Sequence, residues 1–150
     1  MEPVDGDGAD EPPAEAVVDD VVISDEAHAG RGRMTVLRLT WHPGDPLAVE
    51  LVLITQPDHP ALPRGRWVVL RDFVRYGLDE PTGDGEVRIR PDELRDRVWF
   101  ELARPGRAAS VSVPRSTARD FLDRTEQVVP AGDERSEAAL DDLLTRLLGA

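Results

Sequence analysis

The sequence predicts an α+β protein, with an antiparallel β-sheet of about six to seven strands and two C-terminal helices packed on it. From Leu37 to Val113, apolar and polar side chains alternate in several segments, which is the period of a β-strand. After Pro114 the apolar residues are spaced three and four apart, which is the period of a helix. Strands first and helices last favour helices packed on one side of a sheet.

Three strands are expected before residue 55. Residues 16–23 are rich in β-branched side chains and are expected to form an edge strand. In the next segment Leu37, Leu39 and Trp41 alternate with polar residues. Residues 47–54 alternate as well, and their second face is also apolar. Its members are Ala48, Val52 and Ile54. This strand is therefore predicted to be central and covered on both faces.

The segment after this strand is predicted to contain a loop, a short strand and one helical turn. Residues 56–63 hold three prolines and are expected to form the loop, and residues 66–70 the strand. A helical turn over residues 72–76 is expected to have Asp72 as its N-cap. We expect Gly77 to end this turn in the left-handed conformation, in which glycine is favoured.

Turn-forming residues predict where the next strands reverse. Residues 81–85 (Pro-Thr-Gly-Asp-Gly) are typical of a turn, and Gly83 is expected to need a positive φ. Residues 86–90 form a strand in this interpretation, with Val87 and Ile89 pointing inward. Pro-Gly at 105–106 separates two further strand-like runs, which predicts a hairpin. Those runs are residues 98–103 and 108–113.

Two helices are expected at the C-terminal end. The buried side of the first is predicted from the helical spacing of Ala118, Phe121, Leu122 and Thr125, and residues 130–132 (Pro-Ala-Gly) end it. The second helix carries a leucine stripe at helical spacing. The stripe consists of Leu140, Leu143, Leu144, Leu147 and Leu148. A core face is the default interpretation of such a stripe, and a partner-binding face is the alternative.

Charge and length divide the chain into an arm and one domain. The formal net charge is -12, and the first 30 residues hold ten acidic side chains and no arginine. Residues 1–15 are acidic and poor in apolar side chains, so we expect a disordered arm there. Residues 16–150 are expected to form a single domain. The arm has two possible roles, a solubilising tail or a docking segment.

The absence of cysteine and lysine restricts the chemistry. Without cysteine there are no disulfides, thiol nucleophiles or sulfur-ligated metals, and without lysine there is no Schiff base or phosphate-loop lysine. The acidic start differs from the basic start of a signal peptide. The longest apolar runs are too short to span a bilayer. A cytoplasmic protein without membrane insertion is therefore expected.

No catalytic, cofactor-binding or metal site is predicted, and no residue is assigned to partner binding. None of the three histidines has a second ligand at metal-binding spacing, and none of the five serines lies in a nucleophile elbow. The histidines are His28, His42 and His59, and the serines are Ser24, Ser110, Ser112, Ser116 and Ser136. Gly83-Asp84-Gly85 lacks the phosphate-binding pattern, and Asp141-Asp142 fits a solvated helix face.

Nucleic-acid binding is the rival class, and it depends on six arginines. They are Arg88, Arg90, Arg95, Arg97, Arg104 and Arg107. Five acidic residues are interleaved with them, so residues 86–107 carry only +1. Contact with phosphates usually requires a basic stripe, and the charge balance therefore disfavours nucleic acid. The fold could still separate the charges into a basic face.

Five short motifs stand in order between about residues 34 and 148. They are Trp41-x3-Asp45-Pro46-Leu47-Ala48-Val49, Trp67-Val68-Val69-Leu70-Arg71-Asp72-Phe73-Val74-x2-Gly77-Leu78, Pro81-Thr82-Gly83-Asp84-Gly85-Glu86-Val87-Arg88-Ile89, Phe121-Leu122-Asp123-Arg124-Thr125 and Val129-Pro130-x-Gly132-x-Glu134. Their order and spacing resemble the SsgA-like sporulation and cell-division proteins of filamentous actinobacteria. Leu47 stands where that family usually has tyrosine, and Val69-Leu70 where it has Phe-Ala.

The resemblance implies a non-enzymatic regulator of sporulation-specific cell division. Such a protein acts through protein–protein contacts in septum site selection or septal assembly. The implied partners are other SsgA-like proteins and the tubulin-like division GTPase, and the implied oligomer is a trimer recruited to the septum. The implied fold is a whirly-like antiparallel sheet with C-terminal helices. Because whirly-like proteins bind single strands, a single-stranded nucleic-acid-binding protein is the alternative function.

Overall fold

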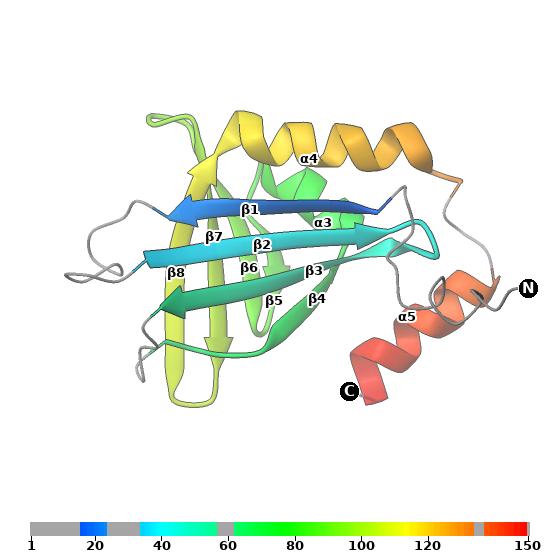
Figure 1. The fold of residues 1–150 in the computed structure, drawn as a ribbon, viewed down its shortest axis with the longest axis horizontal. Helices are drawn as coiled ribbons and strands as arrows, with labels where there is room; N and C mark the ends of the chain where they lie inside the picture. Colours follow the sequence, from blue (N-terminus) through cyan, green and yellow to red (C-terminus); the bar gives the residue numbers. More distant parts are fainter. Residues whose placement is uncertain (1–15, 24–33, 57–61, 134–136, 150) are drawn as a thin grey trace, which may run out of the picture.

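The computed structural model describes residues 16–23, 34–56, 62–133 and 137–149, which form two four-stranded antiparallel sheets and three helices (Figure 1). The first sheet contains β1 (Val17–Ile23), β2 (Met34–His42), β3 (Asp45–Gln56) and β4 (Arg66–Leu70). The second contains β5 (Thr82–Asp84), β6 (Val87–Asp92), β7 (Arg97–Arg104) and β8 (Arg107–Pro114). The helices are α3 (Arg71–Gly77), α4 (Arg115–Val128) and α5 (Glu137–Gly149).

The α+β class with antiparallel strands and C-terminal helices is confirmed. The described strands number eight and divide between two sheets, whereas one sheet of about six to seven was expected. In each sheet the strands are neighbours in sequence order, so hairpin-like connections account for the pairing. The expected arm, residues 1–15, lies outside the described residues, as does part of the expected loop at 56–63.

The core lies between the inner faces of the two sheets, whose strands cross in Figure 1. Strand β1 is at the edge of the first sheet, as its β-branched composition predicted. The alternating residues Leu37, Leu39 and Trp41 of β2 are fully buried, which confirms the strand period there. Val87 and Ile89 of β6 point into the same core, also as predicted. Each side chain of this size contributes roughly 1.5–3 kcal/mol when it is fully buried.

Helix α4 covers one end of this core and runs alongside β1 (Figure 1). Its buried residues are Ala118, Phe121, Leu122 and Thr125, the four that the helical spacing predicted. The hairpin predicted around Pro105-Gly106 joins β7 to β8, and Arg104 and Arg107 pair across it. These elements confirm the change from strand to helix period at Pro114.

Strand β3 is central in its sheet, but its second face is covered only near its start. Leu47 and Ala48 are buried in a small cluster with Leu143 of α5. Farther along the strand, Val52 and Ile54 are only half-buried, because α5 does not extend over them. The prediction of two covered faces is therefore correct for the first part of β3 alone.

Two predictions about α3 were wrong in detail. The helix begins at Arg71, its N-cap is Leu70 without a side-chain hydrogen bond, and Asp72 lies in the first turn. Asp72 therefore does not cap the helix. Gly77 does not have a positive φ, and the C-cap residue Leu78 is right-handed with φ of -68°. Gly77 is required for space, because a Cβ there would lie 2.3 Å from Cγ2 of Ile89.

The turn expected over residues 81–85 is in part a strand. Thr82–Asp84 form β5 and pair with Val87–Ile89 of β6, so the chain reverses at Gly85 and Glu86. Gly83 has φ of +111°, as predicted, and a Cβ there would lie 2.5 Å from the carbonyl oxygen of Val87. The glycine therefore lets two backbones approach closely in this short hairpin.

We predict that Gly77→Ala destabilises the protein by about 1–3 kcal/mol, because the added methyl group overlaps Ile89. Alanine is the better helix former by about 1 kcal/mol, so a purely helical effect would have the opposite sign. Urea denaturation of both proteins measures the difference. The control is Gly44→Ala, where a Cβ meets no atom within 4 Å. Equal stability of the two variants would contradict the steric argument.

Candidate partner-binding surface

The residues that could support catalysis or metal binding do not form such a site within the described ranges. His42 lies half-buried at the end of β2, whereas His28 and His59 lie outside the described residues. Among the residues that the structure describes, no three His, Asp or Glu side chains come together to hold a metal ion. Likewise, no helix of the described part is long and apolar enough to cross a membrane.

The serines have structural surroundings where they are described. Ser112 is buried in β8, where Nε of Arg97 donates a hydrogen bond to its Oγ at 2.7 Å. Ser110 is half-buried on the same strand, and Ser116 is exposed at the start of α4. Ser24 and Ser136 lie outside the described residues. Asp141 is exposed on α5, which agrees with a solvated helix face, and the side chain of Asp142 is not described.

Two surface carboxyl groups have lowered pKa values, because hydrogen bonds stabilise their anionic forms. A hydrogen bond from Nε of Arg38, at 2.7 Å, is the main cause of the lowered pKa of Asp20. For Asp92 the main cause of the lowered pKa is a hydrogen bond from Nε1 of Trp99 at 3.1 Å. A general acid at neutral pH requires a raised pKa, so neither group is suited to that role.

The six arginines of residues 88–107 do not form one basic stripe. Arg90 donates to Glu101 at 2.7 Å and lies over the ring of Trp99, and Arg97 donates to Ser112. These guanidinium groups therefore stabilise the second sheet. Of the remaining four, Arg88, Arg95 and Arg107 are exposed, and Arg104 lies between the two sheets. The six arginines do not share one basic surface, because their side chains point to both faces of the sheet.

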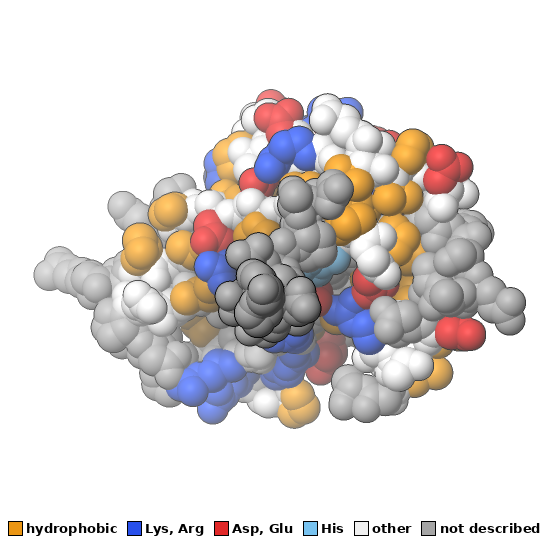
Figure 2. Space-filling model, turned by 45° about the vertical axis from the view of Figure 1, so that its right-hand side comes forward, with side chains coloured by type: hydrophobic (Ala, Val, Ile, Leu, Met, Phe, Trp, Pro, Cys, Tyr) orange, Lys and Arg blue, Asp and Glu red, His pale blue; other side chains and the backbone are white. Residues whose placement is uncertain are grey.

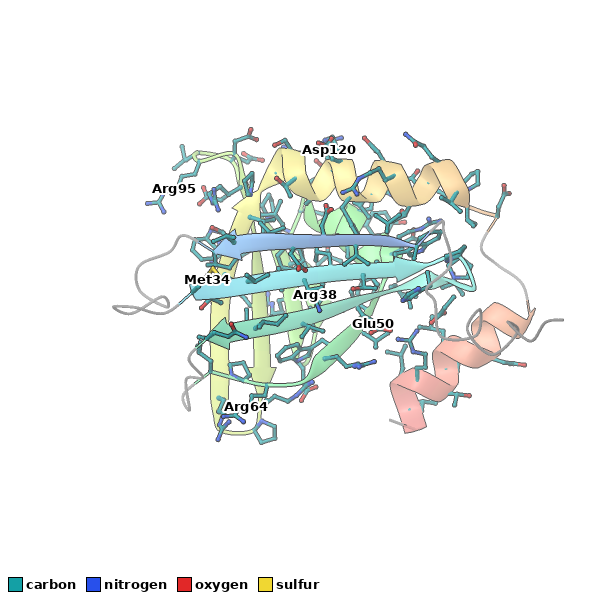
Figure 3. All side chains as sticks on the ribbon, in the orientation of Figure 1. Met34, Arg38, Glu50, Arg64, Arg95 and Asp120 are labelled. Carbon is teal, nitrogen blue, oxygen red and sulfur yellow. The ribbon has the colours of Figure 1, made fainter. Side chains whose placement is uncertain are left out.

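A different set of arginines comes together at the end of the β7–β8 hairpin. We call Arg64, Arg66, Arg104 and Arg107 the arginine cluster. Arg104 holds it together: its Nη2 donates to the carbonyl oxygen of Arg66 at 2.6 Å, and its guanidinium lies 4.1 Å from the centre of the Trp67 ring. Figure 3 shows Arg64 beside the hairpin turn, and Figure 2 shows blue side chains along this lower edge. Sequence reasoning missed the cluster because its members come from two separate segments.

A cavity of about 710 Å³ lies next to the arginine cluster, and we call it the β4 pocket. All five residues of β4, from Arg66 to Leu70, line it. The other lining residues are Phe73 of α3, Glu86, Val87, Arg104, and Arg146 and Leu147 of α5. The pocket therefore lies along the open side of β4, between the two sheets and α5.

The leucine stripe of α5 is mostly exposed, and its default interpretation as core was wrong for three residues. Leu143 is 4% exposed, whereas Leu144, Leu147 and Leu148 are 53%, 47% and 83% exposed. The side chain of Leu140 is not described. We call Leu144, Leu147 and Leu148 the leucine face. An exposed apolar helix face favours the alternative interpretation, a surface for a partner.

Helix α5 is held by one leucine and one arginine. Leu143 packs on Leu47 and Ala48 of β3, with Val68 and Leu70 of β4 around it. Arg146 forms ion pairs with Asp45 and with Glu50, whose Oε2 accepts from Nη2 at 2.5 Å. These contacts fix the helix in place while its leucine face points away.

Comparison with known proteins identifies relatives that are all described as sporulation and cell division proteins. A family model described as "Streptomyces sporulation and cell division protein, SsgA" matches residues 35–134. A sporulation-specific cell division protein SsgB from Kineococcus radiotolerans is 34% identical over 123 residues, which cover 75% of this chain and 74% of the relative. The SsgB of Streptomyces coelicolor is 32% identical over 112 residues, covering 73% and 79%.

A solved structure is similar as well. It comes from work on mutations in SsgB that correlate to longitudinal cell division during sporulation of Streptomyces coelicolor. It matches this chain with a TM-score of 0.61 and 27% sequence identity. The match covers 79% of this chain and 90% of the solved chain. Sequence and fold therefore indicate the same group of proteins.

We predict that Leu143→Ala lowers the free energy of unfolding by about 2 kcal/mol, because it leaves a cavity under α5. Leu148→Ala removes the same atoms from an 83% exposed position and is expected to change the free energy by less than about 0.5 kcal/mol. Both substitutions have the same helix propensity effect, so urea denaturation of the pair isolates burial. Equal losses would mean that the leucine face is buried in solution.

Proposed function

Because the chain belongs to the SsgA family of Streptomyces sporulation and cell division proteins, we propose that it acts in sporulation-specific cell division. We further propose a non-enzymatic regulator that acts through protein–protein contacts in septum site selection or septal assembly. Its partners in this proposal are the tubulin-like division GTPase and other SsgA-like proteins. The match over residues 35–134 is the observation that carries the proposal.

The surface of the protein supports a role in binding other proteins. The leucine face exposes three large apolar side chains on one helix. Exposed apolar residues that gather in one place are typical of protein–protein contact sites. The lowered pKa values of Asp20 and Asp92 do not favour acid catalysis by these groups. The exposed leucine face is a feature that a protein-binding function would use.

Self-association and recruitment belong to the same proposal. We propose a homo-oligomer, with a trimer as the expected state, in the cytoplasm and recruited to the cell septum. The leucine face supports association because an apolar helix face is stabilised by burial against a partner. Light scattering on the purified chain, whose mass is 16.5 kDa, measures the number of copies.

Single-stranded nucleic-acid binding is the second candidate, and the arginine cluster favours it. Such proteins also need aromatic rings on which bases stack. Trp41 and Trp67 are buried, and Arg90 lies over Trp99, so these rings are not open platforms. Filter binding to oligonucleotides distinguishes the candidates. Binding at about 50 mM salt that falls steeply as salt rises would support nucleic acid.

We predict that a fluorescent fusion of the chain forms regular foci or ladders at septa during sporulation. The fusion with Leu144→Asp and Leu148→Asp is expected to become diffuse, because charges on the leucine face oppose apolar contact. Live imaging of sporulating filaments measures both. The control is Leu94→Asp, which changes a 99% exposed leucine in the turn between β6 and β7. A diffuse signal from the unaltered fusion would contradict recruitment to the septum.

A further inference from the structure

We propose that the β4 pocket binds an extended segment of another protein, which adds to β4 as a further strand and directs acidic side chains toward the arginine cluster. The inference rests on the proposed protein-binding function and names its surface and the kind of partner. It concerns a site separate from Leu144 and Leu148, and the two can be tested independently.

The first support is the open edge of β4. The first sheet ends at β4, which pairs with β3 and, within the described residues, with no strand on its other side. The carbonyl of Arg66 points away from β3, because it accepts from Arg104. Main-chain groups of an antiparallel strand alternate in direction, so the N–H and C=O of Val68 point to the open side as well. An added strand would form its hydrogen bonds there.

The shape of the pocket is the second support. Residues of both faces of β4 line it, which places the cavity along the edge of the strand and not over one face. Its walls are α5 on one side and the Glu86, Val87 and Arg104 region of the second sheet on the other. A volume of about 710 Å³ is within the range of sites that enclose a ligand. An extended chain fits a cavity that all five residues of one strand line.

The charge of the site determines the chemistry of the segment. The lining carries three arginines (Arg66, Arg104 and Arg146), which pair with Glu86, Glu50 and Asp45. Arg66 is the most available of them, because its side chain is 70% exposed and its contact with Glu50 is 3.3 Å long. The other two members of the arginine cluster, Arg64 and Arg107, add positive charge at the hairpin end. Carboxylates form bidentate, charge-assisted hydrogen bonds with guanidinium groups. An acidic side chain is therefore expected at this end of the bound segment.

The pocket also has apolar lining residues on its helices, beside Arg146 of α5. Phe73 of α3 is half-buried and Leu147 of α5 is 47% exposed, and both line the cavity. Successive side chains of a strand point to opposite faces, so a bound segment presents alternate residues to these two walls. We expect apolar residues of the segment to contact Phe73 and Leu147. The segment is thus expected to combine acidic and apolar side chains.

Two other occupants are less suitable. The chain's own residues 1–15 are also acidic, but they contain Pro3, Pro12 and Pro13, which lack the N–H that strand pairing needs. Nucleic acid would need open aromatic rings, and the ring of Trp67 is covered by Arg104. A segment of another protein satisfies the main-chain, apolar and charge features together.

The test is selection of peptides from a phage-displayed library of random 12-residue sequences on the full chain. Enriched peptides are expected to combine acidic and apolar residues. Val68→Pro removes the N–H on the open edge, where a strand tolerates proline, and it also replaces a side chain that packs near Leu143. We expect it to weaken binding about tenfold. Val68→Thr keeps the N–H and is the matched control.

The charge contribution is tested with a second pair of variants. The double substitution Arg64→Gln and Arg66→Gln is expected to weaken binding of the enriched peptides about tenfold. Arg95→Gln is the control, because Arg95 lies at the β6–β7 turn, far from Arg64 in Figure 3, and does not line the pocket. Melting curves of all variants confirm that they fold.

Several results would overturn the proposal. These are enrichment of basic peptides, no enrichment, or equal binding to the Val68→Pro and Val68→Thr proteins. Enrichment that appears only when Asp5, Asp7 and Asp10 of the full chain are changed to Asn would assign the pocket to the chain's own arm. These results concern the pocket alone. Septal localisation of the unaltered fusion tests the proposed function separately.

Discussion

The buried guanidinium of Arg71 joins the first sheet to both neighbouring helices. It begins α3, lies 5.5 Å from the centre of the Trp41 ring, and donates through Nη1 to Oγ1 of Thr125 at 3.2 Å. A charge removed from water costs several kcal/mol unless its surroundings stabilise it, so these positions constrain one another. Thr125 in turn donates to the carbonyl of Leu122. The exposed ion pair of α4, Arg124 with Asp19, is worth about 1 kcal/mol or less and adds little to this arrangement.

The same chemistry recurs at each tryptophan, which explains where the arginines are used. Arg71 lies over Trp41, Arg90 over Trp99 and Arg104 over Trp67. A planar guanidinium stacks on an aromatic ring and still donates hydrogen bonds at its edge, whereas an ammonium group does not. In a chain without lysine, arginines therefore serve as structural parts as well as surface charges. For this reason the arginine content of residues 86–107 was a poor guide to a binding face.

Local patterns predicted most of the fold, and contacts between distant segments account for what they missed. The alternation in β2 and the helical spacing in α4 were sufficient because each depends on a single element facing one core. Gly77 is needed because Ile89, twelve residues later, occupies the space of a side chain, and no local pattern reports this. The exposure of the leucines of α5 could not be predicted from the sequence either, because an apolar stripe has the same spacing whether it meets the core or a partner. The arginine cluster likewise exists only after β4 and the β7–β8 hairpin meet.

The leucine face and the β4 pocket are physically connected, and this bears on how a partner would act. Leu147 belongs to both, and Arg146 next to it pairs with Glu50, which also accepts from Arg66 at 3.3 Å. A carboxylate that engaged Arg66 would therefore compete with Glu50 and alter the charge that holds α5. The helix has little else to retain it, since Leu143 is its one buried side chain among those described. The two surfaces thus share one glutamate and two arginines, whereas Leu144 and Leu148 do not line the pocket and Val68 is not part of the leucine face, so substitutions at these positions separate the two surfaces.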